Sequence, residues 1–463
     1  MPFPQRPNLH QPDADRGTRC PAVATHENWG EATLKYRHRV LILLASLSVI
    51  TYLDRVCISV AGPRIQDELS LSPQDWGLVT GAFQIAYALF EIPSGFLGDR
   101  FGARAMLTRI VLWWSAFTAL TGVVSKMWSL LIVRFFFGAG EAGAFPTAST
   151  SIFRWFPTAE RGRAFGVVWL SSQLGGAIAP LVIVPIQMHL GWRASFFLFG
   201  IVGVVWAGGW WRWYRNRPDE KTGITDRELA EIGSALEAPV QTFPWKAIVS
   251  NKSVWAIMGS AFAYVYAMSF FLFWLPTYMM RTRGFSEGET ILSALPFVLG
   301  AAANMTGGFA RDGAVRKWGP KSGSRIICLV GLTTAATAAV AALLSPDRYA
   351  ALAWLALCYG GATFQQPTVW ATCVDIGKRY AGAVAGCMNT AASLGGLASS
   401  VIFGYLVQRS GSYDAVLLSM AGVLIVGAGL WLRIDATETL ERRGVQPASP
   451  VLPPAQAPQI TRG

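Results

Sequence analysis

The chain has 463 residues, of which 52% are hydrophobic and only 14% carry a charge. Soluble domains carry about 25% charged residues, so this composition excludes an ordinary soluble enzyme or binding protein. The net charge of +12 could suggest a nucleic-acid partner. However, most of the Lys and Arg residues fall in segments that we place on one side of a membrane. That asymmetry follows the positive-inside rule, so we predict no nucleic-acid partner.

Apolar blocks of about 20 residues, the length that crosses a bilayer, recur along most of the chain. We therefore predict an all-α polytopic membrane protein with twelve transmembrane helices and both termini in the cytoplasm. The predicted spans are residues 40–60, 76–97, 105–124, 128–150, 163–186, 194–214, 254–280, 289–310, 325–344, 349–373, 381–407 and 414–433. The short outer loops favour a multi-pass protein of a bacterial inner membrane.

Polar stretches divide the chain into five segments. The first stretch has no apolar core, so we do not expect a cleaved signal peptide, and the first span serves as the insertion signal. We predict a cytoplasmic arm (1–39), an N-terminal bundle (40–214), a cytoplasmic linker (215–253), a C-terminal bundle (254–433) and a disordered cytoplasmic tail (434–463).

The first span carries an acid and a base side by side, Asp54 and Arg55, in an otherwise apolar run. One charge at the centre of a membrane helix costs about 2.5–3.5 kcal/mol, so the pair must face a protein interior or a wet cavity. Alternatively, the helix ends at Leu53 and both charges lie among headgroups. The apolar run continues through Val60, however, so we expect the pair to find partners within the membrane.

The fourth span offers those partners, Arg134 and Glu141, about two turns apart on nearly one helix face. The two helices run in opposite directions, so all four charged groups can line one cavity at overlapping depths. We predict that Asp54 and Glu141 couple protons and that Arg55 binds substrate. Arg134 adds cavity charge or, alternatively, braces helix ends.

Several stretches of the first half recur in order and at nearly constant spacing in the second half. Gly95–Asp99 ends the second predicted helix, and Gly308–Asp312 ends the eighth. Ser172–Gly176 is likewise echoed by Ala392–Gly396. We infer a duplicated six-helix unit. Two such bundles related by an axis along the membrane normal are typical of rocking carriers.

The stretch Gly95–Arg104 resembles the loop 2–3 signature of the major facilitator superfamily. Five further stretches look like its anion:cation symporter family, which includes bacterial sugar-acid carriers and the vertebrate sialic-acid and vesicular glutamate transporters. They are Tyr52–Arg55, Arg134–Glu141, Phe156–Arg163, Leu275–Tyr278 and Lys378–Gly382. The resemblance covers roughly residues 34–435. The chain departs from the pattern at Thr51 and Cys57, where Asn is common, and at Glu91, where Gln is more usual.

The resemblance also implies a latch at the cytoplasmic ends of the helices. Asp99 would pair across these ends and hold the outward-open state, and Arg104 lies in the tight turn that follows. We assign Glu91, Asp312 and Asp375 to the same cytoplasmic gate.

Five polar or aromatic residues at mid-depth could contact the hydroxyl groups of a sugar acid. They are Tyr52, Tyr87, Gln173, Trp370 and Asn389. Tyr87, Gln173 and Asn389 lie where the resemblance implies substrate-binding residues. The alternative role of such residues is interhelical hydrogen bonding, which suits Gln173 equally well and Trp370 better.

Enzymatic motifs in the chain do not stand in an enzymatic context. Gly138–Gly143 matches GxGxxG inside an apolar helix with no preceding strand, so close helix packing explains it. Gly284–Gly288 matches GxSxG in an outer loop, where Ser286 serves as a helix cap. No histidine falls mid-membrane, and the 6 cysteines show no metal-site spacing. We predict neither an enzyme nor a metal or cofactor.

Charge counting predicts the mechanism. Arg55 and Arg134 balance ionised Asp54 and Glu141, so a carboxylate substrate adds a negative charge that a low-dielectric interior tolerates poorly. Uptake of a proton by one acid restores the balance. We predict a monomeric proton-coupled symporter of an organic anion, with a sugar acid such as a hexonate, hexuronate or glucarate implied by the resemblance. The alternative is a proton-coupled antiporter or exporter of another small carboxylate or drug-like compound.

Overall fold

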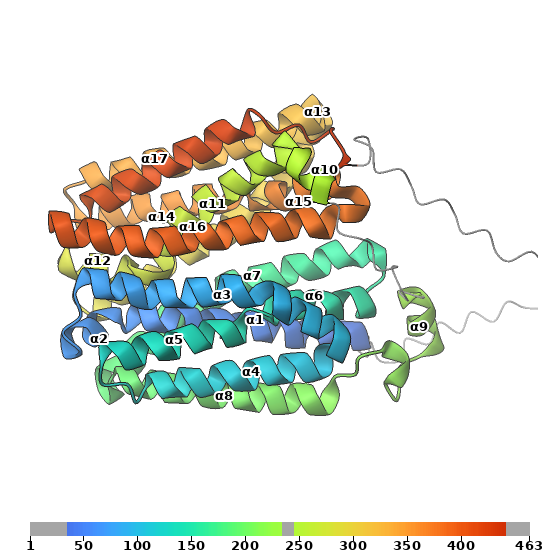
Figure 1. Ribbon diagram of the computed structural model, residues 1–463, viewed down its shortest axis with the longest axis horizontal. Helices are drawn as coiled ribbons and strands as arrows, with labels where there is room; N and C mark the ends of the chain where they lie inside the picture. The colour runs from blue at the N-terminus through green and yellow to red at the C-terminus, as the bar shows by residue number, and fades with distance from the viewer. Residues whose placement is uncertain (1–34, 234–244, 441–463) are drawn as a thin grey trace, which may run out of the picture. The chain divides into compact units, whose positions relative to one another are not determined.

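The computed structural model describes residues 35–233 and 245–440, and helices make up nearly all of them (Figure 1). The N-terminal half contains α1 (Tyr36–Val60), α2 (Gly62–Glu68), α3 (Pro73–Phe101), α4 (Ala103–Thr121), α5 (Met127–Glu141), α6 (Ala144–Trp155), α7 (Thr158–Leu190) and α8 (Trp192–Trp213). The linker contains η1 (Pro218–Glu220), α9 (Asp226–Ile232) and α10 (Trp245–Ser250). The C-terminal half contains α11 (Lys252–Phe273), α12 (Leu275–Arg281), η2 (Gly288–Ala294), α13 (Leu295–Leu344), α14 (Arg348–Phe364), α15 (Gln366–Gly377), η3 (Lys378–Tyr380), α16 (Ala381–Ser410) and α17 (Asp414–Trp431). All of these helices belong to the unit that begins at Tyr36.

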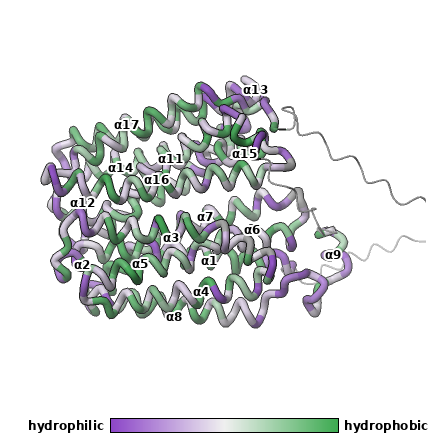
Figure 2. The backbone as a smooth tube through the Cα atoms, in the orientation of Figure 1, coloured by the Kyte–Doolittle hydropathy of each residue, from purple (hydrophilic) through white to green (hydrophobic). Residues whose placement is uncertain are grey.

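Eight helical segments in the described ranges are long and apolar enough to cross a membrane. The segment that contains α13 includes two of the predicted spans. The backbone breaks between these two spans at Gly319 (φ 77°), just before Pro320. The predicted spans that are not among these eight segments correspond to α3, to α4 and to α14 with α15. α3 and α4 carry charged residues, and α14 is a 17-residue helix that continues into α15 after Gln365. Figure 2 shows hydrophobic residues along the long helices and hydrophilic residues around α9.

Each half packs largely within itself, α1 on α7 and α4 on α8 in the first, α13 on α14 and α11 on α16 in the second. The halves meet where α3 packs on α16 and where α7 packs on η2 and α13. Glycines bring α3 and α16 together: a Cβ at Gly77 would lie 2.5 Å from the Ser400 carbonyl oxygen, and one at Gly404 would lie 2.7 Å from that of Pro73. Small residues therefore allow close backbone approach at this contact.

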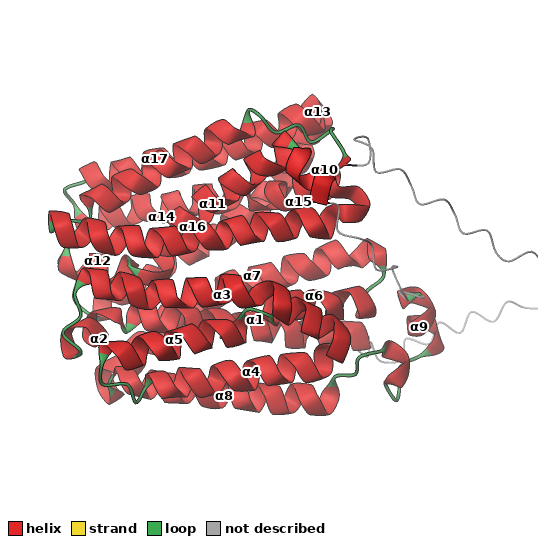
Figure 3. Ribbon diagram, in the orientation of Figure 1, coloured by secondary structure: helices red, strands yellow, loops and turns green. Residues whose placement is uncertain are grey.

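Loops and turns join the helices (Figure 3), and residues at the start of two membrane segments form hydrogen bonds that fix where each segment begins. Ser72 accepts a hydrogen bond from the Asp75 N–H at 3.1 Å, and Asp75 accepts from the Ser72 N–H at 3.0 Å, which completes the capping box that begins α3. Ser286, the predicted helix cap, and Glu289 form only part of such a box. The Glu289 carboxylate accepts from the Ser286 N–H and hydroxyl, and the segment begins as the 3₁₀ helix η2.

The linker helix α9 is attached to the N-terminal half. Thr225 caps it, and the Glu228 carboxylate accepts the backbone N–H groups of Tyr36 and Arg37 at 3.2 and 3.0 Å. Glu228 therefore satisfies two donors at the start of α1 that have no partner within that helix. Most of the predicted arm (residues 1–34 of 1–39) and most of the predicted tail (residues 441–463 of 434–463) lie outside the described residues. The division of the chain into five segments stays a prediction.

Candidate functional site

Four charged side chains from α1 and α5 are buried together in the N-terminal half. Asp54 is 2% exposed, and Arg134 and Glu141 are each 1% exposed. The Arg55 side chain is 13% exposed, and its Nε donates to Glu141 Oε1 at 2.5 Å. Asp54 lies within electrostatic range of Arg134 and Glu141. The structure thus brings together the four groups that the sequence placed in one cavity.

Many polar atoms of this cluster make no hydrogen bond within the described chain. They include both carboxylate oxygens of Asp54, Nη2 of Arg55, Nε and Nη2 of Arg134 and Oε2 of Glu141. An unsatisfied buried donor or acceptor costs about 1–3 kcal/mol, and more where it is charged. A cluster with this many open positions is suited to exchanging ligands and protons rather than to holding the fold.

Aromatic rings surround the two guanidinium groups. The Arg55 guanidinium lies over Tyr87 at 4.9 Å, Phe83 at 5.4 Å and Tyr52 at 5.6 Å from the ring centroids. Arg134 also lies over Phe83, at 5.1 Å. The predicted residues Tyr52 and Tyr87 therefore lie against Arg55, and Phe83, which was not predicted, lies between the two arginines. Such cation–π contacts stabilise a positive charge where water is scarce.

Two hydrogen bonds link the halves near this cluster. The Tyr359 hydroxyl of α14 donates to Gln173 Oε1 of α7 at 2.9 Å. The Asn389 amide of α16 donates to the Glu91 carboxylate of α3. Gln173 and Asn389 were both predicted to bind substrate, whereas Tyr359 was not singled out.

Trp370 of α15 packs against Trp169 of α7 with ring centroids 5.9 Å apart. Trp169 in turn stacks on Phe145 at 5.1 Å. The predicted residue Trp370 therefore lies at an aromatic contact between the halves. Trp169 and Phe145, which belong to the same contact, were not predicted from the sequence.

The residues assigned to the cytoplasmic gate do not form one group. Glu91 was placed with Asp99, but the structure pairs it with Asn389, because its face of α3 meets α16. Asp375 accepts from Arg311 at 2.8 Å within the C-terminal half, and Asp312, with a side chain 71% exposed, lies 3.6 Å from the same arginine.

The remaining two gate residues lie on either side of the turn between α3 and α4. The side chain of Asp99 lies outside the described residues. The Arg104 Nε donates to the Trp211 carbonyl oxygen at 2.9 Å, so its guanidinium contacts the end of α8.

The two ends of the helices differ in how the halves meet. At the end away from the linker, α2 of the first half forms ion pairs with the second half, Arg64 with Glu287 at 2.6 Å and Asp67 with Arg281 at 2.6 Å. We call these two pairs the outer clamp. A Trp76 indole N–H also donates to the Phe273 carbonyl oxygen at 3.1 Å.

At the linker end, the starts of α7 and α16 are uncovered. A Cβ added at Gly162 or Gly166 of α7, or at Gly382 or Gly386 of α16, would meet no atom within 4 Å. In the described residues, ion pairs thus join the halves at the end with the outer clamp, whereas the starts of α7 and α16 have open space beside these four glycines.

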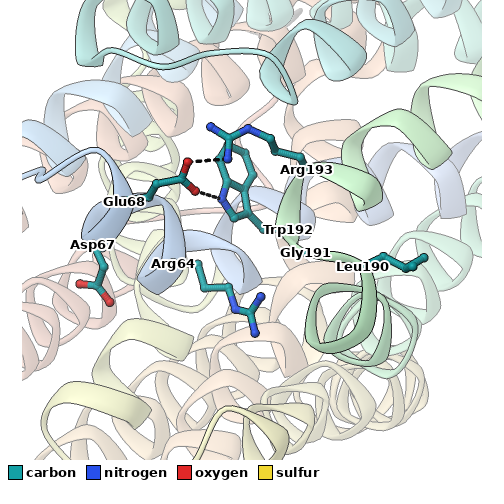
Figure 4. Close-up of a pocket in the computed structure, with 7 residues that line it drawn as sticks. All are labelled: Arg64, Asp67, Glu68, Leu190, Gly191, Trp192 and Arg193. Atoms are coloured by element: carbon teal, nitrogen blue, oxygen red, sulfur yellow. Dashed lines mark hydrogen bonds and ion pairs between the residues drawn. The ribbon is translucent and has the colours of Figure 1, made fainter.

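A cavity of about 630 Å³ opens beside α2, lined by Arg64, Asp67, Glu68, Leu190, Gly191, Trp192 and Arg193 (Figure 4). Its charged groups are already paired: Glu68 accepts from the Trp192 indole at 2.7 Å and from Arg193 at 2.5 Å. These hydrogen bonds hold the pKa of Glu68 below its usual range. The buried cluster on α1 and α5, with its unpaired atoms, is therefore the better candidate for the functional site.

Comparison with known proteins identifies the family of this chain. The profile described as Major Facilitator Superfamily matches residues 44–400. A probable sulfoacetate transporter of Cupriavidus necator is 34% identical over 88% of this chain and 96% of its own length. A hexuronate transporter of Bacillus subtilis is 31% identical over 84% of this chain and 92% of its own length. The crystal structure of a bacterial homologue of the human lysosomal transporter Spinster, inward-facing and unoccupied, superposes with a TM-score of 0.69 at 20% identity, over 90% of this chain and all of that one.

Proposed function

The chain belongs to the Major Facilitator Superfamily, and we propose that it carries a small organic anion into the cell in symport with protons, by alternating access. It is an integral membrane transporter rather than an enzyme. The observation that carries the proposal is the arrangement around Arg55, whose side chain is 13% exposed and whose guanidinium has one buried nitrogen unpaired and an acid on another.

Arg55 has the chemistry to hold the carboxylate of the cargo. A guanidinium presents donors in a planar fork that matches a carboxylate, and such charge-assisted pairs are the strong ones. Its Nη2 makes no hydrogen bond in the described chain, whereas its Nε is engaged by Glu141. A cargo carboxylate therefore competes with Glu141 for the same cation.

That competition couples cargo to protons. When a carboxylate engages Arg55, Glu141 loses part of its counter-charge in a site only 1% exposed. An extra negative charge in such an interior is costly, and proton uptake by Glu141 or Asp54 removes it. Asp54 is suited to the same exchange because neither of its carboxylate oxygens has a hydrogen-bond partner in the described chain. Arg134 supplies fixed positive charge to both acids.

The cross-half hydrogen bonds support a hydroxylated cargo. Gln173 with Tyr359 and Asn389 with Glu91 place donors and acceptors around Arg55 that sugar hydroxyls can replace or extend. The relatives with printed cargo include carriers of a hexuronate and, as a probable assignment, of sulfoacetate. We favour a sugar acid such as a hexonate, hexuronate or glucarate. Tyr52, Tyr87 and Trp370 add aromatic surface for its carbon chain.

The same proposal includes the setting of the protein. Two of the similar carriers come from bacteria, and the excess of Lys and Arg in the predicted cytoplasmic segments supports an inner-membrane protein with both termini in the cytoplasm. The uncovered starts of α7 and α16 then face the cytoplasm, and the outer clamp faces outward. We expect a monomer to be the transporting unit.

The test is binding and counterflow of galactonate and glucuronate by the purified, reconstituted protein. Arg55→Lys keeps the charge but loses the planar fork, so we expect it to lose most binding, and Arg55→Ala all of it. Arg227→Lys is the matched control, because Arg227 is 90% exposed on α9. Unchanged affinity of Arg55→Ala in calorimetry would remove Arg55 from the cargo site. A wild-type protein that carries neither acid would contradict the proposed cargo class.

A further inference from the structure

Glu91 takes no part in the proton coupling proposed above and enters there only as the partner of Asn389, yet it is 9% exposed in a membrane helix and reaches across to the other half. We propose that Glu91 is a cargo-binding residue that accepts hydrogen bonds from hydroxyl groups of the carried acid and rejects acids with a second anionic group. The inference rests on the proposed function, because it assumes that the cargo carboxylate lies at Arg55.

The first observation is the partner of Glu91. Its carboxylate accepts from the neutral Asn389 amide, and among the described residues no Lys or Arg nitrogen lies within 4 Å of it. An ionised carboxyl offers about four acceptor positions on two oxygens, and one amide donor leaves most of them open. Donors from a ligand are therefore the natural complement of this group.

The second observation is its place relative to Arg55. Tyr87 lies one helical turn before Glu91, so the two side chains share a face of α3 with roughly 5–6 Å between their Cβ atoms. The Arg55 guanidinium lies 4.9 Å from the Tyr87 ring and within electrostatic range of Glu91. Glu91 and Arg55 thus form two poles of one site beside Tyr87.

The two poles select for the chemistry of a cargo at both its ends. A carboxylate at Arg55 directs the rest of an extended carbon chain along Tyr87 toward Glu91 and Asn389. Hydroxyl groups there donate to Glu91 and accept from Asn389. A second carboxylate or a sulfonate at the same place meets the like charge of Glu91, which costs binding. The cargo class that fits is a polyhydroxylated monoanion, so a hexonate or hexuronate is favoured over glucarate.

Four probes separate the requirement for hydroxyl groups from the requirement for a single negative charge. Galactonate is a hydroxylated monoanion, hexanoate lacks hydroxyls, galactarate is a hydroxylated dianion, and sulfoacetate is a dianion without hydroxyls. We would measure their affinities by competition in counterflow with reconstituted protein. The wild type should bind galactonate at least about tenfold more tightly than each of the others, the effect of one hydrogen bond to a charged group.

Glu91→Gln removes the charge and keeps an acceptor oxygen. It should weaken galactonate by a few-fold and strengthen galactarate, so that their ratio narrows by about tenfold. Glu91→Ala should weaken galactonate further and leave hexanoate unchanged. Glu68→Gln is the matched control, because it makes the same change at an acid in the outer cavity, and it should leave every ratio as in the wild type.

The outcomes distinguish this inference from the proposed function. If the wild type carries none of the four acids, both are wrong. If it carries them without preferring galactonate over galactarate, only the role of Glu91 is overturned, and this result needs no variant to fold. Equal losses for galactonate and hexanoate in Glu91→Ala would make Glu91 a structural residue and overturn the inference as well.

Discussion

The two halves of the molecule repeat one helical plan but distribute charge differently. α1 and α5 hold Asp54, Arg55, Arg134 and Glu141 in the first half. The corresponding helices of the second half, α11 and α14, carry no charged residue between positions 253 and 273 or between 349 and 364. The second half presents neutral hydrogen-bonding groups instead, the Tyr359 hydroxyl and the Asn389 amide.

This asymmetry has a physical reason in a carrier whose halves move apart. Charges that neutralise one another must stay together in both states, because a separated buried charge costs several kcal/mol. Groups that contact the cargo only while it is bound can lie on the moving partner and remain neutral. We interpret the first half as the half that exchanges protons, and the second as a neutral surface that contacts the cargo and contributes to specificity.

The largest expected effect tests the charged half. Glu141→Gln imitates the protonated acid permanently, so it should keep substrate binding and substrate–substrate exchange but lose proton-driven accumulation entirely. Counterflow and gradient-driven uptake in liposomes measure the two activities in parallel. Asp219→Asn, a change at a half-exposed linker acid, is the control. Accumulation at the wild-type level would leave Asp54 as the coupling acid.

A smaller effect is expected from the neutral half. Tyr359→Phe removes the hydroxyl that donates to Gln173, a neutral hydrogen bond worth about 1 kcal/mol, so cargo affinity should fall about fivefold. The pH dependence of uptake should stay that of the wild type, because no titrating group of the first half is changed. A shift of that pH profile would mean that the second half also takes part in proton handling.

The outer clamp is the place where charges do cross between the halves. Both pairs are partly exposed, so reversing one charge in Arg64→Glu should cost up to about 1 kcal/mol and shift the population toward the outward-open state by roughly fivefold. The double change Arg64→Glu with Glu287→Arg should restore the wild-type distribution. Distances between spin labels on α2 and α12 measure this distribution. If the single reversal leaves the distribution unchanged, the outer clamp does not stabilise the closed arrangement of these ends.

The smallest effect compares the repeated latch positions. Asp99→Asn should shift the resting population toward inward-open by a few-fold, whereas Asp312→Asn should do less, because that side chain is 71% exposed and its ion pair is weak. Spin labels at the cytoplasmic ends of α3 and α16 measure the shift. Equal shifts for the two variants would mean that the latch is symmetric after all.

The sequence predicted the fold, the family and the charged cluster because each depends on a local signal. A charge within an apolar run is conspicuous, so Asp54, Arg55 and Glu141 could be found without coordinates. The predicted membership of the major facilitator superfamily is confirmed by the match over residues 44–400. The twelve spans likewise follow from hydropathy, including the pair that meets at Gly319 in α13.

Contacts between the halves could not be predicted in the same way. Glu91 was assigned by its depth along α3, but its partner depends on how α3 is rotated toward α16. Phe83, Trp169 and Tyr359 resemble the many aromatic residues that face lipid or core, and nothing local separates them. The i, i+4 spacing of Phe83 and Tyr87 on the helix that meets Arg55 was the one signal that could have indicated an aromatic wall.

The glycine contact between α3 and α16 has a mechanical consequence. Gly77 and Gly404 meet near the outer ends of their helices, at a distance that leaves no room for a side chain. If the helices tilt about this point, the stretch of α3 from Gly77 to Phe101 is the long arm of a lever. At 1.5 Å per residue, each degree of tilt carries its far end through roughly 0.6 Å. A tilt of about 10° at this contact would therefore move the far end of α3 by about 6 Å, roughly the width of a small solute, while the outer ends hardly move.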